Sequence, residues 1–109
     1  MADGEAATPK RPRPLTPPEV TAAIQYCLTA GQVVPTKHFR EQGFLRHYTV
    51  QDAVNALEVG QVSSDPPQWN ERMRDWTYKV HGLDLEDDVL TVVVGIGPRK
   101  HVVWLVTAY

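Results

Sequence analysis

The spacing of apolar residues predicts three helices in the first half of the chain. In the first helix, apolar residues recur every three or four positions and form one stripe: Val20, Ala23, Ile24 and Cys27. Such a stripe is typical of a helix that packs on one face. Thr16 and Glu19 have the spacing of a capping box, and Pro17 stands at the first helical position. We therefore predict a helix over residues 17–30.

A short extended connector, Val33–Pro35, leads to the second helix. Thr36 can cap a helix over residues 37–45, because its hydroxyl can accept a hydrogen bond from a free backbone N–H of the first turn. Phe39 is the main apolar anchor of this helix.

The third helix, over residues 50–59, has a clearer signal. Thr49 and Asp52 form a pair that resembles a capping box, and Gly60 is a natural end. Apolar side chains again form one stripe: Val50, Ala53, Val54 and Leu57.

The second half of the chain changes to the period of strands. Between residues 75 and 82, three apolar side chains alternate with three polar ones: Trp76, Tyr78 and Val80 against Thr77, Lys79 and His81. Residues 89–96 and 102–109 are apolar on both faces, as in strands that are covered on two sides. Residues 63–67 form a loop ahead of these strands, and short turns join the strands to one another. Such short connections favour an antiparallel meander.

These elements predict an α+β domain in which the N-terminal helices pack on one face of a small, three-stranded antiparallel sheet. Residues 1–14 have no apolar periodicity, and we expect a disordered tail that adds little to stability. Residues 15–109 then form a single domain. Its core is expected to contain the apolar residues of the predicted faces: Val20, Ile24, Phe39, Val54, Leu57, Val80, Val92, Val94 and Val103.

Charge and cysteine content narrow the class of protein. The chain has 13 acidic and 11 basic residues and a formal net charge of −2. Nucleic-acid-binding domains usually carry a basic excess, so RNA binding requires a local basic patch here. The single cysteine, Cys27, excludes an internal disulfide and favours a reducing, cytoplasmic compartment. We expect no membrane partner, because no apolar run is long enough to span a bilayer and no signal peptide is visible.

Four segments follow one another after residue 35: Thr36–Arg40, Arg46 with Thr49–Leu57, Trp76–Asp84, and Leu90–Val94 with a closing strand that ends at Thr107. In their order and spacing they resemble a small bacterial family, domain of unknown function 4258. His47 and Asp87 stand where this family usually has glycine.

That family is similar in turn to a larger group with the RelE/barnase/colicin type of fold, in which two helices lie on one face of an antiparallel sheet. Many members of this group are toxins that cleave RNA. The resemblance therefore implies a RelE-like fold, with RNA and a cognate antitoxin or other protein as candidate partners. Because a fold does not fix an activity, the chemistry has to be argued from the residues.

The densest basic cluster of the chain lies at the second predicted helix: Lys37, His38, Arg40, Arg46 and His47. Cleavage of RNA without a metal needs a base for the 2′-hydroxyl, an acid for the leaving oxygen, and cations for the phosphate. His38 can be that acid or base, and Lys37 and Arg46 can bind phosphate. The cluster also fits a solvated helix face, with His38 as a helix-start residue.

The polar face of the strand at residues 75–82 offers two further catalytic candidates, Lys79 and His81. A polar sheet face is also what solvent exposure alone produces. On the last strand, Thr107 can contribute a hydroxyl to a substrate site.

Two arginines, Arg72 and Arg74, lie between Trp69 and Trp76. Aromatic rings interleaved with arginines can stack on exposed bases, and Arg74 is a candidate ligand for phosphate. Packing inside the fold is the alternative role for both tryptophans. The histidines and the single cysteine lack the spacing of metal ligands, and no phosphate loop or dinucleotide motif is present, so we expect neither a metal nor a cofactor.

Two functions remain open. One is metal-independent cleavage of RNA by His38 with Lys79 or His81, in which four other residues bind the substrate: Lys37, Arg46, Arg74 and Thr107. The other is a non-catalytic protein-binding module on the same fold, which the acidic balance favours. A concave positive groove that contains His38 would support the first function, and a flat or acidic sheet face the second.

Overall fold

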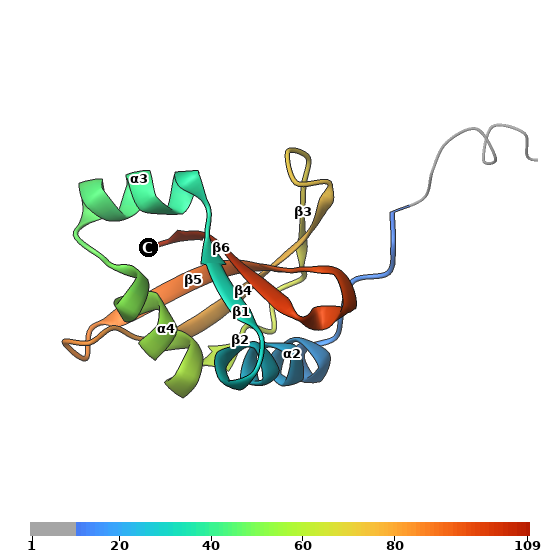
Figure 1. Ribbon diagram of the computed structural model, residues 1–109, viewed down its shortest axis with the longest axis horizontal. Helices are drawn as coiled ribbons and strands as arrows, with labels where there is room; N and C mark the ends of the chain where they lie inside the picture. Colours follow the sequence, from blue (N-terminus) through green and yellow to red (C-terminus); the bar gives the residue numbers. More distant parts are fainter. Residues whose placement is uncertain (1–10) are drawn as a thin grey trace, which may run out of the picture.

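The computed structural model describes residues 11–109, without the side chain of Pro98. It confirms the α+β class, and the predicted helices and long strands end within one residue of the observed ones (Figure 1). Along the described residues the elements are α2 (Pro17–Thr29), β1 (Gln32–Pro35), α3 (Lys37–Arg46), α4 (Val50–Val59), β2 (Gln61–Val62), β3 (Gln68–Asn70), β4 (Asp75–Leu83), β5 (Val89–Ile96), the 3₁₀ turn η1 (Pro98–Lys100) and β6 (Val102–Ala108).

The strands form one mixed sheet in the order β1–β6–β5–β4–β2, and β3 also pairs with β4. The expected three-stranded meander is its antiparallel centre, β4–β5–β6. The structure corrects the expectation at one edge, where the connector Val33–Pro35 belongs to β1 and runs parallel to β6. Pro35 fits there because an edge strand has a free side on which a missing N–H costs little.

Two further strands, β2 and β3, were not predicted and lie on either side of the expected loop at residues 63–67. They pair with opposite ends of β4, β2 at His81 and Val80 and β3 at the residues from Asp75 to Thr77. With two and three residues, they are too short to show a hydrophobic period.

The helices begin where the capping signals predicted. The Thr16–Glu19 and Thr49–Asp52 pairs both form reciprocal capping boxes, and the Thr36 side chain caps α3. These side chains satisfy N–H groups that have no partner within the helix.

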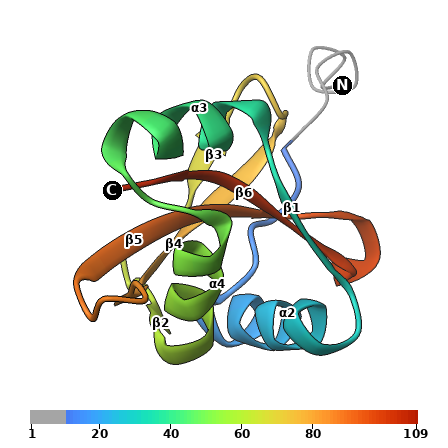
Figure 2. The same cartoon turned by 60° about the vertical axis from the view of Figure 1, so that its left-hand side comes forward.

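One face of the sheet carries the core. The helices α2 and α4 cover this face, whereas α3 lies along β6 and rises, like β3, on the other side (Figures 1 and 2). The predicted core residues are buried except for Val54, which is half-buried.

Val54 is displaced from the core because α4 turns Ala56 towards the sheet. Ala53, Ala56 and Leu57 are its buried residues, and the backbone of Ala56 lies so close to Gly82 that a Cβ at Gly82 would clash with it. The two small residues therefore set how closely α4 approaches β4.

The expected disordered tail is only partly within the described residues, since residues 1–10 lie outside them. Residues 11–14 have no regular secondary structure, but they lie against β4. The indole Nε1 of Trp76 donates a hydrogen bond to the Pro12 carbonyl (2.6 Å).

Leu57→Ala should lower the free energy of unfolding by about 2–5 kcal/mol, because the side chain is 5 % exposed and its removal leaves a cavity between α4 and the sheet. Val59→Ala, on the same helix, is the control, since Val59 is 58 % exposed. Urea unfolding of both variants measures the difference. Similar losses for the two would contradict the packing described for α4.

Asp52 should make stability depend on pH. Partial burial opposes its ionisation, but hydrogen bonds from Leu85 N, Thr49 N and the Thr49 hydroxyl outweigh this and lower the pKa of Asp52. A lowered pKa stabilises the fold above the unfolded value of about 3.9, and the contribution is lost as the pH falls through the folded value. At pH 7, Asp52→Asn should be less stable than the wild type by about 0.5–1.5 kcal/mol.

Urea unfolding at pH 7 and at pH 3 tests this effect of Asp52. The stability difference between the wild type and Asp52→Asn should shrink at the lower pH. A difference that stays constant would show that the charge of Asp52 plays no part.

Candidate functional site

The sheet face opposite α2 and α4 consists of three rows of opposed residues. Residues paired across neighbouring strands point to the same face, so the strand registers define these rows. They are Thr77–Gly95–Trp104, Lys79–Val93–Thr107 and His81–Thr91–Tyr109. The three polar residues that alternate in β4 thus share this face, and their exposure increases from the buried Thr77 to the exposed His81.

The first turn of α3 forms a wall at one side of this face. The Thr36 hydroxyl accepts a hydrogen bond from Phe39 N (3.1 Å) and donates one to the Leu105 carbonyl of β6 (2.9 Å). These bonds hold the start of the helix beside the sheet. Lys37 and His38 follow directly and are both exposed, and the helix N-terminus adds the positive end of its dipole.

The opposite wall is the hairpin that joins β3 to β4. Asn70 Oδ1 accepts a hydrogen bond from Met73 N (2.9 Å), which closes the turn. The Met73 side chain lies over the sheet, because a Cβ on Gly95 would be 3.0 Å from Met73 Cε. The same turn carries Arg72, which is exposed.

Between these walls lies a cleft of about 790 Å³, which we call the α3–β3 cleft. Lys79, Val93 and Thr107 form its floor, which is the middle row of the sheet face. Among the described residues that line it, none is an aspartate or a glutamate. Its basic side chains come from both walls and the floor: Lys37, His38, Arg72 and Lys79.

Asp65 lies near the cleft without lining it. Asp65 Oδ2 is 4.0 Å from Lys79 Nζ, at the limit of an ion pair. The Asp65 side chain is 64 % exposed, so solvent screens this contact and the pair holds Lys79 only weakly.

The structure brings four of the residues singled out in the sequence to this cleft: Lys37, His38, Lys79 and Thr107. It does not bring the other three there. His81 lies one row further along β4, where its Nδ1 is 2.9 Å from Thr91 Oγ1, and it lines a separate hollow beside β2. Arg46 is the last residue of α3, and Arg74 lies in the hairpin turn with a left-handed φ of 52°.

Arg72 and Gln68 also line the cleft, but the sequence does not assign them to it, because β3 is too short to be predicted. Arg72 had been noted only for its position between Trp69 and Trp76. Those two rings pack edge to face at 5.4 Å, and Trp69 is also among the residues that line the α3–β3 cleft. Both tryptophans are half-buried and pack on each other, and the stacking of a base on these rings stays a prediction.

Within residues 11–109, no three His, Cys, Asp or Glu side chains gather in a way that could hold a metal ion. No helix in the same range is long and apolar enough to cross a membrane. Cys27 is a buried free thiol, and burial raises its pKa.

Comparison with known proteins gives one match. The family model described as "Domain of unknown function (DUF4258)" matches residues 35–109, from the end of β1 through β6, and it includes every residue that lines the α3–β3 cleft. No curated protein and no solved structure matches the chain.

Proposed function

The chain belongs to the DUF4258 family, and we propose that it is a metal-independent ribonuclease-type domain that acts on RNA in the α3–β3 cleft. The observation that carries the proposal is the lining of this cleft. It combines a histidine with three cations, and no described residue that lines it has an acidic side chain. A polyanion is the ligand that such a lining favours.

The proposed chemistry is transfer of the RNA phosphate to the neighbouring 2′-hydroxyl. Neutral His38 removes the proton from the 2′-oxygen, which attacks phosphorus while the bond to the 5′-oxygen breaks. The 5′-oxygen takes a proton from a second group, for which Lys79 on the cleft floor is the candidate. The products are a 2′,3′-cyclic phosphate and a free 5′-hydroxyl, and no metal is needed.

The cations would stabilise the charge that develops on the phosphate in this step. Lys37 and Arg72 lie on opposite walls and Lys79 on the floor, so a bound phosphate would be approached from three sides. The Thr107 hydroxyl, opposite Val93 and two strands away from Lys79 in the same row, is a hydrogen-bond donor for a phosphate or sugar oxygen.

The resemblance of the family to RelE/barnase/colicin-type domains, inferred from the sequence, supports the same reading, since many of those domains are toxins that cleave RNA. The sheet with helices α2 and α4 on one face is consistent with that architecture. We propose the bacterial cytoplasm as the setting, where the free thiol of Cys27 would stay reduced.

His38→Ala should lower the rate of RNA cleavage by about 10²–10⁴-fold, the usual effect of removing a general acid or base. The fold should survive, because the side chain is exposed. His101→Ala is the matched control, since His101 is also exposed but packs on Tyr26, outside the cleft. Cleavage of end-labelled RNA in the presence of EDTA measures the rate, and thermal melting checks the fold. Equal rates for wild type and His38→Ala would remove His38 from the mechanism.

Arg72→Ala should weaken RNA binding and reduce the slope of log Kd against log salt by about one, because one phosphate contact is lost. Arg46 was the sequence-based candidate for this contact, and Arg46→Ala removes the same charge from an exposed position at the other end of α3. Arg46→Ala should change this salt slope less than Arg72→Ala does. Titrations at several salt concentrations distinguish them, and a larger effect of Arg46 would move the phosphate path away from the cleft.

A specific observation also favours the second function, a protein-binding module. Phe44 and Leu45 on α3 are 86 % and 67 % exposed, and such neighbouring apolar side chains are typical of interaction surfaces. They line a hollow with Arg40 and Glu41, apart from the α3–β3 cleft. If the wild-type protein neither binds nor cleaves RNA at low salt, the protein-binding function replaces the ribonuclease function.

A further inference from the structure

The segment Arg11–Leu15 crosses the outer end of β4 before α2 begins, and we call it the N-terminal strap. It is fixed to β4 at two points. Trp76 Nε1 donates a hydrogen bond to the Pro12 carbonyl (2.6 Å), and Leu15 N donates one to the Tyr78 hydroxyl (2.9 Å).

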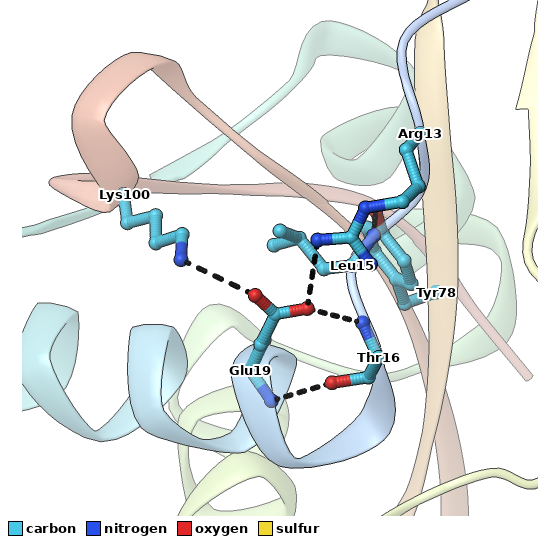
Figure 3. Close-up of polar contacts among 6 residues, drawn as sticks. All are labelled: Arg13, Leu15, Thr16, Glu19, Tyr78 and Lys100. Atoms are coloured by element: carbon cyan, nitrogen blue, oxygen red, sulfur yellow. Dashed lines mark hydrogen bonds and ion pairs between the residues drawn. The ribbon is translucent and has the colours of Figure 1, made fainter.

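The strap is also tied to α2. The Glu19 carboxylate accepts a hydrogen bond from Thr16 N and lies 3.7 Å from Arg13 and 3.9 Å from Lys100 of the β5–β6 turn (Figure 3). The hydrogen bonds of Thr16 and, to a smaller extent, the two cations lower the pKa of Glu19. The carboxylate therefore stays ionised at neutral pH and anchors this end of the strap.

The other end of the strap contacts the hairpin that forms a wall of the α3–β3 cleft. Arg11 Cζ lies 4.8 Å from the ring centroid of Trp69, and Arg11 Nη2 lies 3.3 Å from Glu71 Oε2. Both partners precede Arg72, which lines the cleft. Arg11 thus contacts both β3 and the turn after it, through the Trp69 ring and through an ion pair whose side chains are 55 % and 73 % exposed.

The hairpin needs such a hold because it is weakly attached to the rest of the fold. Within the described sheet, β3 pairs only with β4, over three residue pairs. An isolated two-stranded extension is marginally stable in water. The position of the hairpin relative to the sheet determines the position of Arg72, which lies on the cleft wall opposite Lys37.

We propose that the N-terminal strap positions the β3–β4 hairpin and thereby sets how strongly the α3–β3 cleft binds RNA, with Arg11 as the positioning residue for Arg72. The RNA part of this proposal rests on the proposed function. The hairpin part does not, because it follows from the contacts of Arg11 alone.

Glu71→Gln separates positioning from simple charge. The substitution makes the chain more positive, so electrostatics alone would strengthen RNA binding. If the strap positions the hairpin, RNA binding should instead weaken about two- to fivefold, because the substitution breaks the ion pair with Arg11. Glu58→Gln is the matched control. Glu58 is exposed on α4 and has no ion pair among the described residues, so its variant should bind RNA as well as or better than the wild type.

Arg11→Ala should also weaken binding, by about five- to tenfold, because it removes both the ion pair and the contact with the Trp69 ring. Two variants of opposite charge change would then shift the affinity in the same direction. Arg46→Ala is the control for the loss of one positive charge and should weaken binding less.

Hydrogen exchange of the full-length chain, without RNA, provides the second readout. Amides of residues 68–73 should exchange faster in Arg11→Ala and Glu71→Gln than in the wild type, while those of β5 stay unchanged. Unchanged exchange in the hairpin would overturn the proposal that the strap positions it, whatever the effect on RNA binding. Faster exchange with wild-type RNA affinity would overturn the link between strap and cleft. If the wild type binds no RNA, the proposed function fails, and hairpin exchange alone decides whether the strap holds the wall.

Discussion

The candidate site depends on the way Thr36 joins three elements. Its N–H and its hydroxyl both donate to the Leu105 carbonyl, at 3.0 and 2.9 Å, and its hydroxyl accepts from Phe39 N. One residue therefore ends the pairing of β1 with β6 and begins α3. The Phe39 side chain, in the first turn of α3, is buried in the core and fixes the rotation of the helix. With position and rotation both set, Lys37 and His38 can only lie beside the C-terminal half of β6, where Thr107 stands.

The elements that could be predicted from the sequence are those whose signals are local. A capping box and an apolar stripe are both complete within one helix, and the alternation in β4 is complete within one strand. The strand β1 could not be found in this way. Its partner β6 lies at the other end of the chain, and four residues after a helix look like a connector until Val33 is seen opposite Val103. The resemblance predicts glycine at the positions of His47 and Asp87, and the backbone conformation there fits that expectation. Both residues have left-handed φ angles, 64° and 65°, which glycine adopts without strain.

For the cleft too, the residues that could be placed from the sequence are those with a local signal. Lys37 and His38 follow from the cap at Thr36, and Lys79 follows from the period of β4. Arg46 was grouped with them because it is close in sequence, but nine residues of helix place it about 14 Å along the axis from Lys37. Arg72 could not be assigned to the cleft, since its place depends on β3 and on a strap more than fifty residues earlier in the chain. Composition and spacing cannot place residues whose position depends on long-range pairing.

The acidic balance of the chain does not argue against an anionic ligand once the positions of the charges are known. Exposed charges are screened beyond about 8 Å at physiological salt, so the potential inside a cleft depends on the groups that line it rather than on the net charge. The lining of the α3–β3 cleft is basic on both walls and the floor. Two acids beside these elements are each paired with a cation, Asp65 with Lys79 and Glu71 with Arg11. The second pair matters more for the cleft, because Glu71 is the neighbour of Arg72. By pairing with Glu71, Arg11 contacts the turn at the residue next to Arg72.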